Sequence, residues 1–262
     1  MNPKIHAGLI ALRNLAIGGN LASLSLLSDP RKMVLYVTDN LFSLRSIADS
    51  RGIPQKNVFE IFSEARSASV SLANRNGDTW FIERPSFGLD IIALCLLCRA
   101  LKPRKILEIG TYKGYSALHM ALNSEAEVYT LDLGPTDKPT LDISVTDTGL
   151  AAISKQVMAW DGTPERDRIH QLYGDSARFD FSTYHGQMDL CFIDGAHSYE
   201  YVKSDTLNAL KCCKPGAVLA WHDFGRVSLN GVSKWLLEFS KQHKVYSVPG
   251  GSLAFSGPLS RG

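Results

Sequence analysis

The stretch Lys105-Ile-Leu-Glu-Ile-Gly-Thr-Tyr-Lys-Gly-Tyr-Ser116 decides the fold of this 262-residue chain. Its first half holds the short apolar run that a buried parallel strand requires, made of Ile106, Leu107 and Ile109. Gly110 and Gly114 then bracket a turn, and residues 116–122 follow as a helix. Strand, glycine turn and helix open a nucleotide-binding βαβ unit, so the stretch predicts an α/β fold of the doubly wound type.

The spacing of the glycines differs from that of dinucleotide-binding loops, whose first two glycines stand two residues apart and serve a diphosphate. Here Glu108 precedes Gly110, and the next glycine is Gly114. An acid beside a glycine loop suits a ligand with a cationic group, such as the ammonium and sulfonium of S-adenosylmethionine (SAM). The stretch from Glu108 to Ser116 resembles the first motif of class I SAM-dependent methyltransferases, most closely the catechol-type small-molecule O-methyltransferases.

Strand and helix patterns alternate through the rest of the chain. We expect further strands at 128–133, 169–173, 188–193 and 217–221, helices at 86–101, 150–160, 199–213 and 232–242, and a closing hairpin at 245–255. This order predicts a Rossmann-like, mostly parallel sheet with an antiparallel C-terminal hairpin. Class I methyltransferases end in the same way, so the resemblance implies a SAM-dependent methyltransferase domain over residues 86–262.

Residues 1–85 lie outside the resemblance and are predicted to be a helical extension, with a longer helix over 55–72. Two roles remain open for this extension: a lid over the substrate pocket, or a contact that forms a homodimer. Its most apolar part, residues 5–27, contains no run of about 18 apolar residues. The sequence therefore predicts neither a membrane span nor a signal peptide there.

Composition excludes some classes of function. A net charge of +2 and the absence of a Lys/Arg run argue against a nucleic-acid partner. The five cysteines lack the spacing of a disulfide framework, and Cys95 and Cys98 lie in an apolar helical stretch, which favours core packing over a redox or metal pair. Together with the missing export signal, this usage predicts a cytoplasmic protein.

Acidic residues follow the predicted strands, and ligands of open α/β sheets bind beyond the carboxyl ends of the strands. Asp132 stands 24 residues after Glu108, where a carboxylate can accept both ribose hydroxyls of an adenosine. The resemblance implies that Asp175 accepts the adenine amino group and that Tyr112 and Ser116 lie along the methionine half of SAM. Gly-Asp-Ser at 174–176 is also a common turn, and Ser116 also suits a helix N-cap.

A metal site is predicted where the next two strands end, at Asp194, His222 and Asp223. In the catechol-type family the matching positions are two aspartates and an asparagine that hold magnesium. Asp194 matches the first directly, whereas His222 replaces the second aspartate and Asp223 the asparagine. Magnesium prefers oxygen ligands, and imidazole suits zinc, iron or nickel better. The alternative is a polar pocket floor without a metal, and in either case Asp194 is also expected to face SAM.

His197 is the candidate catalytic base. It stands three residues after Asp194, where catechol-type enzymes carry a lysine that deprotonates the substrate hydroxyl. A histidine titrates near neutral pH and can therefore take up a proton. The segment 194–199, with Asp205 further on, also resembles methyltransferases that include macrolide-sugar and cephalosporin-tailoring enzymes. In the structural alternative, His197 only caps or packs the following helix.

The sequence thus predicts methyl transfer from SAM to a hydroxyl oxygen of a small molecule, assisted by a divalent metal. Three alternatives remain: a cephalosporin-tailoring type of enzyme, a metal-independent methyltransferase on the same scaffold, and a non-catalytic SAM-binding module. No pattern in the sequence encodes the acceptor.

Overall fold

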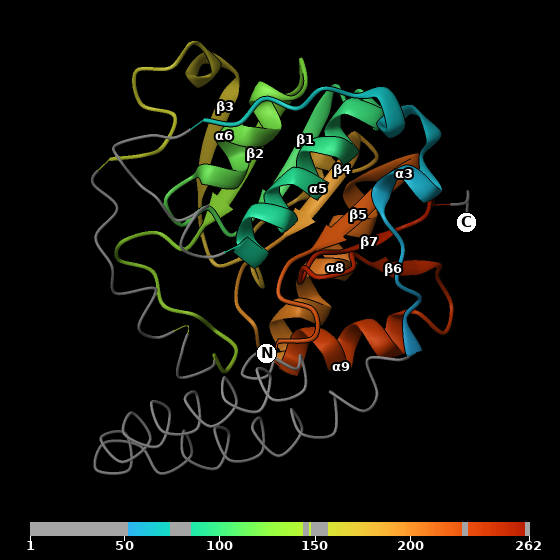
Figure 1. Cartoon of the computed structure of the whole chain (residues 1–262). Helices are drawn as coiled ribbons and strands as arrows, with labels where there is room; N and C mark the ends of the chain where they lie inside the picture. The colour runs from blue at the N-terminus through green and yellow to red at the C-terminus, as the bar shows by residue number, and fades with distance from the viewer. Residues whose placement is uncertain (1–51, 74–84, 144–146, 148–156, 227–229, 260–262) are drawn as a thin grey trace.

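The computed structural model describes residues 52–73, 85–143, 147, 157–226 and 230–259. Its centre is a seven-stranded sheet of order β3-β2-β1-β4-β5-β7-β6 (Figure 1). The strands are β1 Lys105–Ile109, β2 Glu127–Asp132, β3 Ile169–Tyr173, β4 Met188–Ile193, β5 Cys213–Trp221, β6 Val245–Ser247 and β7 Ala254–Ser256. Only β7 runs antiparallel to its neighbours β5 and β6. The predicted doubly wound sheet with an antiparallel C-terminal end is confirmed.

Helices cover both faces of the sheet. The helices are α3 Val58–Ile61, α5 Pro85–Leu101, α6 Tyr115–Leu122, α8 Tyr199–Cys212 and α9 Asn230–Phe239. Because successive strand residues point to opposite faces, Ile106 packs with α5 and α6, whereas Leu107 packs with α8 and α9. The same alternation in β4 and β5 gives two separate apolar layers. The strands β1 and β4 and the second half of β5 are thus buried on both sides, as parallel strands usually are.

The segment 52–73 packs onto this body. Val58 and Phe62 join the apolar layer that contains α5, and Ile53 joins the other layer. The chain also extends the sheet edge, because the amide of Lys56 donates to Ser247 at 2.9 Å and the amide of Ser247 donates to Pro54 at 3.0 Å. The described part of the predicted extension therefore shares the core of the sheet, and residues 1–51 lie outside the described residues.

The predicted long helix over 55–72 is wrong. The helix α3 spans four residues, Val58–Ile61, and a 3-10 helix follows at Ser63–Ser67. Phe62, between them, has the extended dihedral angles φ −117° and ψ 99°. The apolar spacing that predicted a helix instead marks single side chains that anchor an irregular segment against α5.

Two other boundaries differ from the prediction. β5 begins at Cys213 rather than at 217, because Pro215 and Gly216 lie inside the strand beside a register shift in β4. Residues 157–160, the described end of the predicted helix 150–160, form a bend and turn.

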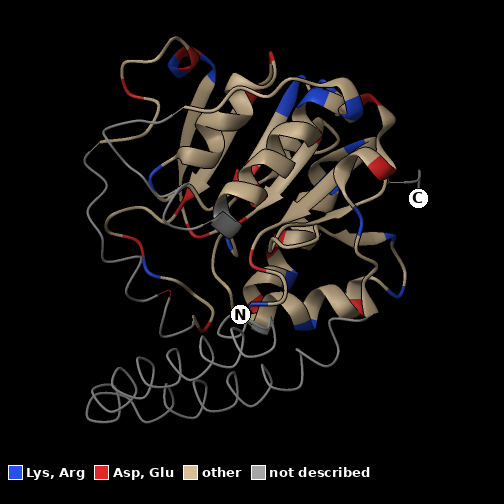
Figure 2. Ribbon diagram, viewed as in Figure 1, with Lys and Arg blue, Asp and Glu red and all other residues tan. Residues whose placement is uncertain are grey.

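Cys95 and Cys98 are both fully buried and free, which confirms their packing role. Basic and acidic residues are interspersed over the described elements (Figure 2). Within the described ranges, no helix combines the length and the apolar character needed to cross a membrane.

Candidate functional site at the strand ends

The tip of β1 lies directly against the tip of β4. The amide of Asp194 donates to the carbonyl of Ile109 at 2.8 Å. Gly110 follows with φ +103°, and a Cβ there would stand 2.1 Å from the carbonyl oxygen of Asp194. Only glycine fits, because both the backbone conformation and the space exclude a side chain. The glycine loop after β1 and the predicted metal site after β4 therefore meet at Gly110.

The second glycine of the loop, Gly114, lies against a buried tryptophan. Gly114 has φ +76° and is the N-cap residue of α6, and a Cβ there would stand 2.2 Å from the ring of Trp160. Trp160 is 2% exposed, and the neighbouring amide of Ala159 donates to Lys113. The ring thus buttresses the glycine loop from outside, a role that the sequence analysis missed.

Glu108 lies behind this loop. It is fully buried and accepts hydrogen bonds from the hydroxyls of Ser116 and Thr130. Burial raises the pKa of Glu108 to about 8, the two hydroxyls oppose this rise, and the charges of Asp194 and Asp132 add to it. The carboxyl is therefore largely neutral at pH 7, and it faces Ser116 and Thr130 instead of presenting a charge at the surface of the loop.

Asp132 closes the loop from the tip of β2. Its Oδ2 accepts the amide of Tyr112 at 2.9 Å, and its Oδ1 accepts the amide of Leu133 at 2.9 Å. Tyr112 has φ +48° and a side chain that is 40% exposed. The carboxylate predicted to bind ribose therefore also fixes the backbone of the glycine loop.

Asp175, after β3, holds the loop that follows β2. Its Oδ2 accepts the amide of Thr140 at 3.0 Å and the hydroxyl of the same residue, and its Oδ1 accepts the hydroxyl of Tyr201 at 2.9 Å. Although burial acts to raise it, these hydrogen bonds lower the pKa of Asp175. Burial and the bond to Asp175 raise the pKa of Tyr201 to about 12. The predicted adenine acceptor thus lies under residues 140–141 in this structure.

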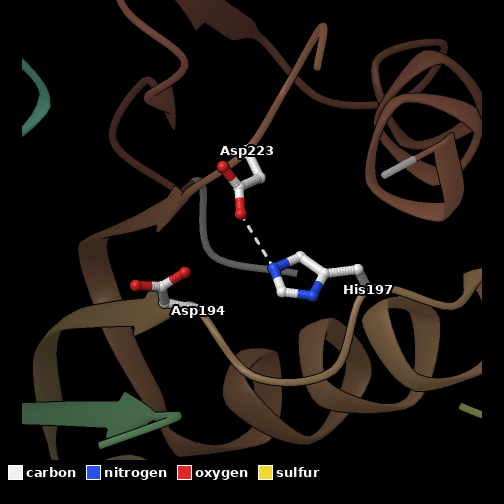
Figure 3. Close-up of side chains that lie close together, drawn as sticks. All are labelled: Asp194, His197 and Asp223. Atoms are coloured by element: carbon white, nitrogen blue, oxygen red, sulfur yellow. Dashed lines mark ion pairs between the residues drawn. The ribbon is translucent and has the colours of Figure 1, made fainter. Parts of the chain in front are cut away.

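Asp194, His197 and Asp223 converge at the tips of β4 and β5 (Figure 3). One donor atom of each lies within 4.8 Å of the others. The Nε2 of His197 is 2.8 Å from Oδ2 of Asp223, and its Nδ1 is 2.5 Å from Oδ1 of Asp147. Asp147 also accepts the backbone amide of His197 at 3.0 Å. The imidazole is therefore fixed at both nitrogens by carboxylates.

His222 adjoins this cluster from the end of β5. Its Nδ1 is 3.1 Å from Oδ1 of Asp194 and 3.3 Å from Oδ1 of Asp223. Its Nε2 is 3.2 Å from Oδ2 of Asp90, a residue of α5 that is 2% exposed. The structure therefore brings all of the predicted metal ligands together and adds His197 to them.

Asp223 is the shared member of the cluster. Its φ of +62° lies in the left-handed region, which aspartate adopts more readily than most residues and which is frequent at functional sites. Its Oδ1 also forms an ion pair with the guanidinium of Arg226. The carboxylate thus contacts two imidazoles and one guanidinium.

The electrostatics of the cluster favour charged histidines. Burial acts to lower the pKa of both imidazoles, but the charges of Asp147 and Asp223 raise the pKa of His197, and those of Asp194 and Asp223 raise the pKa of His222, well above the ordinary value. Burial acts to raise the pKa of Asp223, yet His222 and His197 hold it well below its usual range. In the protein without ligands, both rings are therefore expected to be imidazolium at neutral pH.

A small pocket opens beside the cluster. It is lined by the polar residues Asp194, His197 and His222 and by the apolar Ile193, Val202, Trp221 and Val232. The pocket thus places apolar side chains beside the polar groups of the cluster.

The donor set fits a divalent ion. Nε2 of His197 and Oδ1 of Asp223 are buried, and neither makes a hydrogen bond of normal geometry, although Asp223 and Arg226 lie against them. Two carboxylates and two imidazoles at this spacing are ligands that divalent metals accept.

Asp205 lies below the turn after β4. It is fully buried, and neither carboxylate oxygen makes a hydrogen bond of normal geometry. Burial raises the pKa of Asp205 to about 7, partly opposed by Ser176. A Cβ on Gly195 would stand 3.5 Å from its Oδ2, so Asp205 packs beneath the turn rather than in the pocket.

Sequence reasoning missed Asp90 and Asp147. Asp90 lies 132 residues before His222, and Asp147 lies 50 residues before His197. Asp90 stands in an apolar helical pattern, which was the one local signal of a specific role.

The fold and this arrangement are those of a Rossmann-like domain that binds its ligand beyond the strand ends. Residues 107–224 match the family model described as a methyltransferase domain. This matched segment contains every predicted site residue. The central part of the chain therefore matches a methyltransferase domain, and the resemblance found in the sequence is confirmed.

Solved structures are similar at low identity. The O-methyltransferase TomG from Streptomyces achromogenes, involved in tomaymycin synthesis and in complex with SAM, is 18% identical, with a TM-score of 0.49 over 77% of this chain and 96% of that one. A putative caffeoyl-CoA O-methyltransferase from Staphylococcus aureus is 19% identical, with a TM-score of 0.48 over 77% and 90%. An O-methyltransferase from Bacillus cereus in complex with SAH is 18% identical, with a TM-score of 0.45 over 84% and 90%. At these values the likenesses say nothing of the acceptor of this chain.

Proposed function

We propose that the protein transfers the methyl group of SAM to a hydroxyl oxygen of a small molecule. The observation that carries the proposal is the junction at Gly110, where the loop predicted to hold SAM touches the strand tip that begins the Asp194–His197–Asp223 cluster. A methyl donor held by the glycine loop and a hydroxyl held by the cluster would therefore be neighbours. The match of residues 107–224 to a methyltransferase domain supports the same reading.

The cofactor half of the site offers a distinct group for each part of SAM. Asp132 is proposed to accept the ribose hydroxyls and Asp175 the adenine amino group. Ser116 and the first amides of α6 are proposed to receive the carboxylate of the methionine part, beside Tyr112. Glu108, neutral at pH 7, then donates its own proton to the oxygen of Ser116, which frees the serine hydroxyl to donate to that carboxylate.

The reaction half removes the acceptor proton. The sulfonium of bound SAM supplies the leaving group, so this chain has only to align the hydroxyl and take its proton. As the oxygen bonds to the methyl carbon, the carbon–sulfur pair stays on sulfur and the proton goes to Nε2 of His197. Asp147 orients the ring through Nδ1, so Nε2 is the nitrogen that faces the cluster.

The pH dependence of this step follows from the charged histidine. A proton acceptor must be neutral, and the carboxylates around His197 raise its pKa well above 6.5. Turnover is therefore expected to rise with pH from neutral into the alkaline range, as the fraction of neutral imidazole increases.

The divalent metal belongs to the same proposal. Asp194, His222 and Asp223 would hold it, and a bound ion would lower the pKa of the acceptor hydroxyl and fix its position. A cytoplasmic location and a lid or dimer role for residues 1–85 stay predictions.

The test is the variant His197→Ala, with the exposed His185→Ala as the matched control. His197→Ala is expected to lower kcat by about 10²- to 10⁴-fold, the usual contribution of a general base, while the Kd of SAM stays within about twofold. Radiolabelled methyl transfer to a panel of phenols and alcohols and calorimetric titration with SAM measure the two quantities. An equal loss of turnover and of SAM affinity would remove His197 from this role.

A further inference from the structure

His222 lies between two sets of carboxylates that face different nitrogens of its ring. Its Nδ1 faces Asp194 and Asp223 at 3.1 and 3.3 Å, and its Nε2 faces Asp90 at 3.2 Å. The ring is 8% exposed, so it is largely shielded from bulk water.

Asp90 is held rigidly from the opposite side. Its Oδ1 accepts the amides of Ser252 and Leu253 at 2.7 and 2.8 Å, and its Oδ2 accepts the hydroxyl of Ser252 at 2.7 Å. A Cβ on Gly251 would stand 2.3 Å from Oδ1, so the turn before β7 closes tightly over the carboxylate. With Oδ2 fixed against Nε2, the proton of the neutral ring belongs on Nε2, and the lone pair of Nδ1 points at Asp194 and Asp223.

A buried carboxylate behind the remote nitrogen of a histidine is the usual support of a metal-ligating imidazole, because it fixes both the tautomer and the orientation of the ring. Neighbouring ligands of one ion stand roughly 3.0–3.4 Å apart when each lies about 2.1 Å from the metal. The distances from Nδ1 of His222 to the two carboxylates fall in this range.

We propose that Asp90 is a positioning residue that makes Nδ1 of His222 a metal ligand, together with Asp194 and Asp223, and that the site therefore takes a transition ion such as zinc, cobalt or nickel in preference to magnesium. Imidazole is a poor ligand for magnesium and a good one for these ions. The inference rests on the metal-assisted part of the proposed function. It adds the class of the ion and a residue outside the matched methyltransferase segment.

His197 is the competing nitrogen ligand, since its Nε2 also converges with Asp194 and Asp223. Its Nε2 contacts Oδ2 of Asp223, whereas His222 contacts Oδ1. The two histidines thus approach different oxygens of one carboxylate, and variants of each separate their roles.

The experiment uses the full-length protein stripped of metal and titrated with cobalt or magnesium, followed by calorimetry and by the visible absorption of bound cobalt. Wild-type protein is expected to bind cobalt at least about 10-fold more tightly than magnesium. Asp90→Asn keeps Oδ1 for the two amides but places an NH₂ group against Nε2, which drives the proton to Nδ1. This variant is expected to bind cobalt about 10- to 100-fold more weakly.

The matched control is Asp189→Asn, in which a carboxylate at the other end of the sheet also accepts two amides, those of Arg104 and Lys105. The control is expected to bind cobalt as wild type does. His222→Ala is expected to lose binding more severely than His197→Ala. Equal cobalt affinity in wild type and Asp90→Asn, a preference for magnesium, or greater loss in His197→Ala would each overturn the inference.

A second measurement does not depend on whether the Asp90→Asn variant folds. Long-range ¹H–¹⁵N spectra of the zinc-loaded wild-type protein are expected to show His222 protonated at Nε2 and without a proton at Nδ1, with the signals assigned by their loss in His222→Gln. A proton on Nδ1 overturns the inference. Methyl transfer is assayed separately. If the protein transfers methyl groups but does not prefer cobalt, only the metal site is refuted. If it prefers cobalt but transfers no methyl group, the metal site is supported and the proposed function is refuted.

Discussion

The two halves of the strand-tip edge satisfy their acids in different ways. On the side of β1, β2 and β3, the acids bind backbone amides and hydroxyls, as Asp132 does with Tyr112 and Leu133. On the side of β4 and β5, the acids bind imidazoles and a guanidinium, as Asp223 does with His197 and Arg226. The first half, the proposed cofactor site, therefore consists of acids held by neutral donors, whereas the second half, the proposed reaction site, consists of paired charges.

The difference also concerns distance along the chain. Tyr112 and Leu133 lie 20 residues and one residue from Asp132, within one βαβ unit. Asp90 and Asp147 come from 132 and 50 residues away from their histidines. The cofactor half is thus a local construction, whereas the reaction half depends on the whole domain being folded.

Gly110 joins the two halves, and its replacement should have the largest effect. In Gly110→Ala the new methyl group would stand 2.1 Å from the carbonyl of Asp194 at a φ of +103°. The strained conformation and the overpacking together should cost roughly 2–6 kcal/mol of stability. We expect loss of both SAM binding and metal binding, measured by calorimetry and by urea unfolding.

The matched control for that prediction is Gly186→Ala. Gly186 also has a positive φ, +66°, but a Cβ there meets no atom within 4 Å. Its cost should be about 1–2 kcal/mol, from the backbone conformation alone, with both binding activities retained. If the two variants behave alike, the contact between the halves is unimportant.

Glu108 gives a pH-dependent difference between the halves. Its pKa is about 8 in the folded protein, against an ordinary value of 4.5, so between these values the folded state holds a proton that the unfolded state releases. Stability should therefore fall as pH rises through this window, by up to roughly 4–5 kcal/mol at 1.36 kcal/mol per pKa unit. Glu108→Gln, a neutral mimic of the acid, should remove the contribution of Glu108 to this slope, whereas that of Asp205, whose pKa burial also raises, should remain.

Urea unfolding at several pH values from 5 to about 9 measures that slope. The exposed Glu125→Gln is the control and should keep the slope of the wild type. A Glu108→Gln variant with an undiminished slope would mean that the carboxylate is charged in the folded protein and that its isolation behind Ser116 is not real.

Asp132 tests the cofactor half alone. Asp132→Ala removes the proposed ribose contacts and the two amide contacts of the loop, and hydrogen bonds to a charged group are worth about 1.5–3 kcal/mol each. We expect the Kd of SAM to rise by about 10²-fold while cobalt affinity changes little. The control is Asp137→Ala, which replaces an exposed acid in the loop after β2. A parallel loss of cobalt binding would show that the halves are not separable.

Sequence reasoning succeeded where structure is local. The bounds of β3 and β4 agree with the predicted strands 169–173 and 188–193, because short apolar runs between turn residues fix them. The glycine loop and the acids at the strand tips follow from the same local order. Asp194, His222 and Asp223 meet because parallel strands end at one edge.

The failures have a common physical cause. Asp90 and Asp147 carry no local signal of their partners, since both side chains reach the histidines only through tertiary packing. The segment 55–72 kept a helical spacing of apolar residues, yet the pairing of Gln55 with Ser247 at the sheet edge and the anchoring of Phe62 override it.

The smallest effect is expected at the outer edge of the cofactor half, where Tyr201 binds Asp175 at 2.9 Å and receives the amide of Thr140 at 3.1 Å. Tyr201→Phe removes only the hydroxyl, which should weaken the hold on this loop by about 0.5–1.5 kcal/mol. Exchange of the Thr140 amide should then accelerate by about 2- to 12-fold, measured by hydrogen exchange with the exposed Tyr173→Phe as control. Added SAM should change this exchange rate in the wild type. If adenine binds while Thr140 stays hydrogen-bonded to Asp175, the amide should be protected. If adenine displaces Thr140, the amide should exchange faster. No change in exchange on adding SAM would place adenine away from Asp175, and the cofactor half would then end at Asp132.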